Sequence, residues 1–201
     1  MKQARGRSLR LRDLFQRGGE IGPILRRFFI NTLFDSTFTQ LGIIIGSAFP
    51  YANPDLRLMM GTLLTSSVAL GISTGVSVYE SETLEREREV AELEKALFRE
   101  LEDTVLAEDY RTYALILSAV NFLTPLMCCG ILIVPLILAT LQFLTVMAAS
   151  WIAVVLALII LFVAGSYLGR LGKQNPLVKG LRMVIFGGVA FTIGFLIQTL
   201  I

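Results

Sequence analysis

Long apolar runs separated by short polar connections make up most of this chain. Five of the runs approach or exceed the length that a membrane helix needs, about 20 residues at 1.5 Å each for a hydrocarbon core of about 30 Å. They cover residues 28–49, 58–79, 111–138, 143–168 and 183–201. Hydrophobic residues form 54% of the 201 positions, which is typical of membrane proteins. The pattern predicts an all-α membrane protein whose five transmembrane helices form one bundle.

An acidic helical segment is expected between the second and third spans. No proline or glycine interrupts residues 76–113, so the second span should continue out of the membrane as a helix. A break is expected near 103–109, followed by a short helix that returns the chain to the membrane. The expected divisions are a basic N-terminal segment (1–27), two spans (28–82), the acidic segment (83–110) and three spans (111–201).

Charge is strongly segregated, although the net charge is only +2. The first 27 residues carry eight Lys/Arg and two acids, whereas residues 80–109 carry twelve acids and four bases. The basic N-terminus and the basic loop at 169–182 are separated by four spans, so the positive-inside rule places both in the cytoplasm. The acidic segment is then cytoplasmic too, and the loop at 50–57, the hairpin at 139–142 and the C-terminus face outward.

The N-terminal segment is expected to lie on the membrane surface. Its apolar side would consist of Leu9, Leu11, Leu14 and Phe15, and Gly18-Gly19 and Gly22-Pro23 would end this short helix. Such a helix rests on anionic lipid. Its adjacency to a spanning helix argues against a nucleic-acid partner. No cleavable signal is recognised, so we expect an uncleaved integral protein of a prokaryotic plasma membrane.

Small and helix-breaking residues give the second and third spans special features. Gly71 and Gly75 form a GxxxG pair, which allows close approach of another helix. Pro125 and Pro135 lie inside the third span and should free carbonyl groups near Asn121 or Ile131. The adjacent Cys128 and Cys129 are interpreted as small packing residues, with soft-metal binding as the alternative.

Asp35 is the only formal charge inside the first span. A carboxylate at the centre of a membrane costs about 2.5–3.5 kcal/mol, so it normally faces protein, a cation or water. Asn31, Asp35 and Thr39 follow one another at four-residue spacing and share one helix face. We expect the bundle to be built around this face. Alternatively, Asp35 lies near the interface and reaches water or pairs with an arginine.

Glutamates recur along the acidic segment. Glu82, Glu85, Glu89 and Glu92 share one helix face, and Glu80 lies on another face of the same expected metal-collecting segment. Carboxylate oxygens are the ligands of cations such as Fe²⁺, Mn²⁺ or Ca²⁺, so this face could collect metal. The alternative is a solvated charged helix supported by its own basic residues. An enzyme is not expected, because the chain has no histidine, no phosphate loop and no nucleophile–base pair.

Four stretches of the chain resemble the vacuolar iron transporter family, an iron and manganese transporter family that includes nodulin-21-like proteins. They are RRFFINTLFDSTFTQLGIIIGSAF, GISTGVSVYESETLEREREVAELE, SAVNFLTPLMCCGILIVPLIL and GSYLGRLGKQNPLVKGLRMVIFGGVAFTIGFLIQTLI. The resemblance covers about residues 26–201. It implies a five-span homodimer that exports Fe²⁺ or Mn²⁺ from the cytosol in a proton-coupled reaction. The metal is the transported substrate, and no resident cofactor is implied.

The resemblance also implies roles for particular residues. Asp35 matches the family's first-helix aspartate, an intramembrane metal ligand, and the acidic segment gathers the metal. Ser36 replaces the usual glycine, and Phe28 stands where the family has a second aspartate. The family's second-helix glutamate and methionine fall at about Ser66 and Thr74. These departures keep a second hypothesis open, a non-transporting scaffold or a carrier of another solute on the same fold.

Overall fold

The computed structural model describes residues 18–49, 54–97 and 105–200. Within these ranges the chain forms five helices: α2 (Gly18–Ala48), α3 (Leu56–Leu97), α4 (Val105–Thr140), α5 (Val146–Leu171) and α6 (Pro176–Leu200). All five are long and apolar enough to cross a membrane. The all-α fold with five helices of spanning length is therefore confirmed. The expected surface helix at 1–17 lies outside the described residues.

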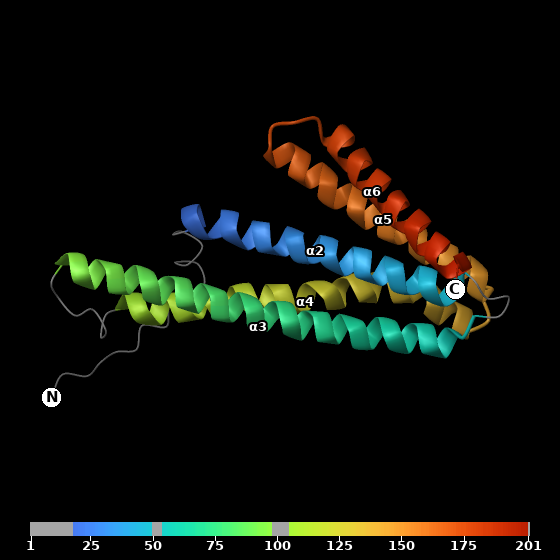
Figure 1. Cartoon of the computed structure of the whole chain (residues 1–201), viewed down its shortest axis with the longest axis horizontal. Helices are drawn as coiled ribbons and strands as arrows, with labels where there is room; N and C mark the ends of the chain where they lie inside the picture. Colours follow the sequence, from blue (N-terminus) through green and yellow to red (C-terminus); the bar gives the residue numbers. More distant parts are fainter. Residues whose placement is uncertain (1–17, 50–53, 98–104, 201) are drawn as a thin grey trace.

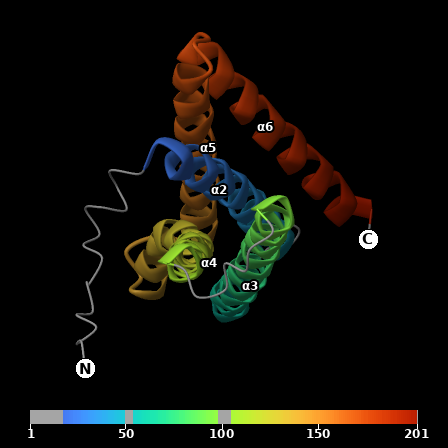
Figure 2. The same cartoon turned by 90° about the vertical axis from the view of Figure 1, so that its left-hand side faces the viewer.

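Helix α2 lies at the centre of the arrangement and contacts each of the other four helices. The long helices α3 and α4 run side by side along one flank, and α5 and α6 form a hairpin on the other (Figure 1). This hairpin lies close to α2 where α2 ends and diverges from it where α2 begins (Figure 1). Figure 2 views the same bundle from its end and shows α3 and α6 on different sides of α2.

Helix α3 joins the second span to the glutamate-rich segment without interruption. It runs over 42 residues to Leu97, as the absence of helix breakers predicts. Residues 98–104 lie outside the described part, and α4 begins at Val105. The expectation of a helix break was wrong for residues 105–109, because these residues belong to α4. The separate short return helix is likewise replaced by one continuous helix, since neither proline nor glycine occurs there.

Two other expected breaks also lie within helices. Gly22-Pro23 is inside α2 rather than ending a preceding helix. Because Pro23 lies close to the start of α2, its missing N–H leaves only a carbonyl near the helix end without its partner. The basic loop expected at 169–182 is a turn of only residues 172–175. Pro176 starts α6, and the Asn175 side chain accepts a hydrogen bond from the Leu177 N–H at 3.1 Å, as in a helix cap.

The hairpin between α4 and α5 is tight, as predicted, but it occupies residues 141–145 rather than 139–142, because α4 continues to Thr140. Gln142 adopts a left-handed conformation with φ of 61°. Thr145 caps α5 by accepting a hydrogen bond from the Ala148 N–H. The turn therefore reverses the chain within a few residues and starts α5 without a long excursion.

Glycines let neighbouring helices approach closely. A Cβ placed on Gly71 would lie 2.7 Å from the Phe122 carbonyl oxygen of α4, which confirms the close approach expected from the GxxxG pair. A Cβ on Gly165 of α5 would lie 2.9 Å from the Lys179 carbonyl oxygen of α6. The two helix pairs α3–α4 and α5–α6 thus pack backbone against backbone.

Two apolar clusters occupy opposite ends of the core. The larger lies where α2 ends and draws buried residues from α2, α3, α4 and α5, among them Leu41, Ile44, Met59, Leu132 and Ala153. The smaller lies near the start of α2, where Val78, Tyr113 and Leu117 pack with Ile24, Leu25 and Phe28. Polar side chains of α2 lie in the stretch between them, and these define the candidate site.

Candidate functional site

Helix α2 carries two polar faces, and the bundle is built around only one of them. Thr32, Ser36, Thr37 and Gln40 are buried. Asn31, Asp35 and Thr39 are exposed on the other side. The expectation that the chain folds around the Asp35 face was therefore wrong. Hydroxyl and amide groups can be satisfied by neutral partners on other helices, whereas burying a carboxylate requires a cation or several donors.

The buried polar layer joins α2 to α3 and α4. Gln40 Nε2 donates to Ser67 Oγ at 2.9 Å and to the Pro125 carbonyl oxygen at 3.0 Å. Thr32 Oγ1 donates to Asn121 Oδ1, and Asn121 Nδ2 donates to the Leu117 carbonyl oxygen at 2.9 Å. Buried polar groups need such partners, so these bonds fix how the three helices meet. Gln40 Oε1 is buried and has no hydrogen-bond partner within the described part of the chain.

Pro125 explains one further bond of this layer. Proline has no N–H, so the carbonyl of Asn121, four residues earlier, loses its helical donor. Thr74 Oγ1 of α3 lies 3.2 Å from that carbonyl oxygen and shares its proton between it and the Leu70 carbonyl of its own helix, at 2.8 Å. The freed carbonyl expected near Asn121 is thus found, and its partner comes from the neighbouring helix. Thr74 is the position where the resemblance sets a methionine, and its hydroxyl is already engaged here.

Asp35 lies at the middle of the candidate span Gly22–Ala48 and is exposed. Within the described part of the chain it forms no ion pair, so the alternative of an arginine partner is not realised there. Its helix face passes between α3 and α6. Phe28 at one end packs near Val78 of α3, and the Gly46 carbonyl at the other accepts from Gln198 Nε2 of α6 at 3.0 Å.

The glutamates of α3 form an open, charged surface. Glu80, Glu85, Glu89 and Glu92 are exposed, and Glu82 is half-buried. Arg86 Nη1 lies 2.6 Å from Glu89 Oε2. The Arg86 guanidinium also lies over the Tyr113 ring, 5.9 Å from its centroid, which ties this part of α3 to α4.

The structure does not bring Asp35 and these glutamates together in one chain. Val78 packs in the same cluster as Phe28, which precedes Asp35 by two turns, while Glu82 lies one turn further out along α3. The separation along the bundle is about 16 Å at 1.5 Å per residue. Among the described residues, no three histidine, cysteine, aspartate or glutamate side chains form a group that could hold a metal ion.

Cys128 and Cys129 are free and buried. The Cys128 sulfur lies 3.9 Å from Thr37 Oγ1, and Cys129 belongs to the larger apolar cluster. Their interpretation as small packing residues is confirmed.

Sequence reasoning overlooked the side chains of Ser67, Asn121 and Thr124, which are buried in the polar layer. One signal was available for Asn121. An asparagine in an apolar run, four residues before a proline, marks a place where side-chain and backbone groups both need partners. For Ser67 there was no such signal, because α3 carries many serines and threonines and only packing selects among them.

Comparison with known proteins supplies one relative and no function. No family model matches the chain. The chain is similar to an uncharacterized protein of the archaeon Methanocaldococcus jannaschii, at 23% identity over 169 residues, which cover 83% of each chain. The resemblance to the vacuolar iron transporter family therefore stays a prediction.

Proposed function

We propose that this protein is an integral membrane homodimer that carries a divalent cation, Fe²⁺ or Mn²⁺, out of the cytosol in exchange for protons. The observation that carries the proposal is the exposed carboxylate of Asp35 at the middle of a helix of spanning length. In contact with lipid it would cost about 2.5–3.5 kcal/mol. A helix face with such a charge needs protein, water or a cation beside it. A hydrated path for cations between protein helices would provide all three.

A second copy of the chain is the cover that fits this face. Helix α3 exposes a stripe of small residues at four-residue spacing, which is typical of helix contacts in membranes: Gly61, Thr65, Ala69, Ser73 and Ser77. In α6 only Gly180 and Gly187 are buried, so most of its surface is free. Both helices border the Asp35 face of α2. The helices that flank Asp35 therefore leave surface for a symmetric partner.

Symmetry also supplies a chemical reason for the dimer. In a two-fold interface the same patch occurs on both subunits, so Asp35 would contribute one carboxylate from each. Two carboxylates near one axis give oxygen ligands for Mn²⁺ or Fe²⁺. This pair would take the place of the second aspartate, for which this chain has Phe28. Each carboxylate then holds either a proton or part of the metal's coordination shell, and this exclusion couples the two ions.

The glutamates of α3 are assigned to the cytosolic entrance. By the charge rule for loops, the basic N-terminus and the turn at 172–175 are cytoplasmic. The acidic end of α3 lies at the same end of the bundle as that turn (Figure 1). Glu80, Glu82, Glu85, Glu89 and Glu92 would then raise the local cation concentration by electrostatic attraction, without forming a closed site.

A scaffold, or a carrier of another solute, is the second candidate. One observation favours it. Among the described residues, the buried polar layer contains hydroxyl and amide groups but no ionised side chain, and the hydroxyl of Thr74 beside it faces the Asn121 backbone carbonyl. Such a layer holds helices together and does not require an ion.

Flux into liposomes separates the two candidates. We expect purified protein in liposomes to move Mn²⁺ or Fe²⁺, detected with an enclosed metal-sensitive dye, and Asp35→Asn to abolish the flux. Asp55→Asn is the matched control, because Asp55 is an exposed carboxylate that caps α3 through the Arg57 and Leu58 N–H groups, and asparagine keeps that cap. Equal flux for wild type and Asp35→Asn would remove Asp35 from the mechanism. No flux for any divalent ion would favour the scaffold.

A further inference from the structure

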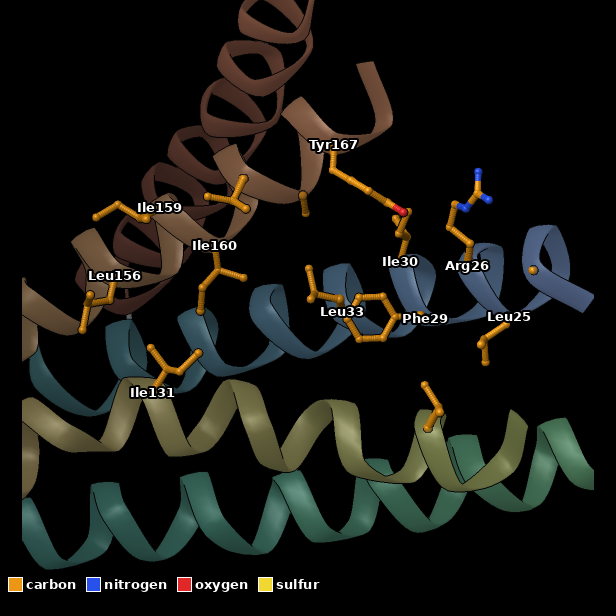
Figure 3. A pocket seen from close by; sticks show the side chains of 14 residues that line it. Leu25, Arg26, Phe29, Ile30, Leu33, Ile131, Leu156, Ile159, Ile160 and Tyr167 are labelled. Atoms are coloured by element: carbon orange, nitrogen blue, oxygen red, sulfur yellow. The ribbon is translucent and has the colours of Figure 1, made fainter. Parts of the chain in front are cut away.

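A groove opens on the side of α2 that faces away from Asp35. It lies between α2, α4 and α5 and has a volume of about 710 Å³. Its walls are almost wholly apolar, and two polar residues, Arg26 and Tyr167, stand at one end. Figure 3 shows the Tyr167 side chain crossing from α5 toward α2, with its hydroxyl beside Ile30 and close to Arg26. Leu156 and Ile131 lie at the far end (Figure 3).

The length of the groove matches one leaflet of a bilayer. Leu156 and Tyr167 mark its two ends on α5, and they are about 16 Å apart along the helix axis. Half of a hydrocarbon core of about 30 Å is nearly the same distance. Arg26 and Tyr167 would therefore stand at headgroup level, while Leu156 and Ile131 reach the middle of the membrane.

Arg26 is half-buried and forms no ion pair or hydrogen bond with any side chain that the structure describes. A guanidinium group in this position favours a partner with paired oxygens, such as a phosphate. The Tyr167 hydroxyl can donate a further hydrogen bond to the same group. Apolar walls below a phosphate-binding end are the features that a phospholipid requires.

We propose that this groove binds one anionic phospholipid, with its phosphate at Arg26 and Tyr167 and an acyl chain along α5. The proposal rests on the membrane insertion proposed above and is independent of transport. A second copy of the chain is a poorer occupant. Arg26 and Asp35 are nine residues apart, about two and a half turns, so a subunit that covers Asp35 leaves the groove on the opposite side of α2 open to lipid.

Lipid bound to the purified protein in detergent tests the proposal. Native mass spectrometry would count lipids per chain after addition of phosphatidylglycerol or phosphatidylcholine. We expect phosphatidylglycerol to bind more tightly, and Arg26→Gln to weaken it by about tenfold, since a charge-assisted hydrogen bond is lost. Arg27→Gln is the matched control, because Arg27 is exposed and does not line the groove. Equal losses of phosphatidylglycerol binding in the two variants would show that general surface charge causes the effect, and would overturn the proposal.

A second pair of variants tests the groove itself. Val163→Trp places an indole on an exposed lining position, whereas Val155→Trp places one on an exposed position of α5 outside the lining. Only the first should displace the bound lipid, with unchanged melting temperatures for both. Retention of lipid in Val163→Trp would place the lipid elsewhere. A change in the dimer fraction rather than in lipid count would show that protein fills the groove.

Asp35→Asn keeps this test separate from the transport proposal. That variant should bind phosphatidylglycerol like the wild type, because its changed residue lies on the other side of α2. If Asp35→Asn loses flux but keeps lipid, the result bears only on the transport proposal. If Arg26→Gln loses lipid but keeps flux, the result bears only on the groove proposal.

Discussion

Thr74 of α3 contacts the backbone of Asn121 of α4, since its hydroxyl proton is shared between the Leu70 carbonyl of its own helix, at 2.8 Å, and the Asn121 carbonyl oxygen, at 3.2 Å. That carbonyl lacks a helical donor because Pro125 has no N–H. The Asn121 side chain in turn accepts from Thr32 of α2. One residue of α4 thus links three helices through its backbone and its side chain.

Thr74→Val should destabilise the protein by about 1–3 kcal/mol, because it keeps the shape of the side chain and leaves a carbonyl unpaired. Thermal or denaturant unfolding in detergent would measure the change. Thr62→Val is the control, since among the described residues the Thr62 hydroxyl donates to the Leu58 carbonyl of its own helix and Thr62 is not part of the small-residue stripe. A similar loss in both variants would contradict the role assigned to Thr74.

Gly71→Ala should separate α3 from α4 and cost about 1–3 kcal/mol through overpacking. The added Cβ would lie 2.7 Å from the Phe122 carbonyl oxygen, which is backbone and cannot turn aside. Gly130→Ala on the exposed side of α4 meets no atom of the described chain within 4 Å and should be neutral or slightly stabilising. The melting temperatures of the two variants would measure this difference in stability. Equal values would argue against the close contact at Gly71.

Thr39→Cys should form a disulfide between two subunits if the Asp35 face is the dimer interface. Thr39 is exposed one turn after Asp35, so two copies of it approach the two-fold axis together. The native cysteines are buried, which favours reaction at the new thiol. Oxidation in membranes followed by non-reducing electrophoresis would show the dimer. Val155→Cys, on an exposed part of α5, is the control, and crosslinking there alone would place the interface elsewhere.

Mn²⁺ should raise the melting temperature of the wild type, with the shift growing as the logarithm of the metal concentration. Replacing Glu82, Glu85 and Glu89 by glutamine should reduce that shift, because the shared face loses the carboxylates that concentrate the cation. Glu87→Gln changes one exposed glutamate on another side of α3 and should leave the shift almost intact. An unchanged shift in the triple variant would exclude this face as the collecting site.

The helices themselves follow from local sequence. Runs of apolar residues predicted each helix of spanning length, and the lack of proline and glycine predicted that α3 continues to Leu97. Local chemistry also explains the places where the expectation failed. Asn175 and Pro176 together start a helix, so the basic stretch that reads as a loop is mostly helical.

Local sequence could not predict which face of α2 is buried. Both the Asp35 face and the Gln40 face carry polar groups at helical spacing, and either is compatible with a bundle interior. The choice depends on partners that other helices bring, namely Ser67, Asn121 and the Pro125 carbonyl. Spacing along one helix contains no information about those partners.

The sequence by itself thus determined five long apolar helices, the acidic extension of α3 and the presence of one carboxylate in the first span, because each depends on neighbouring residues only. The tertiary structure decided that neutral polar groups fill the interior and that Asp35 stays on the surface. The physical reason is the difference in desolvation cost, since a hydroxyl or amide is satisfied by one or two neutral partners and a carboxylate is not.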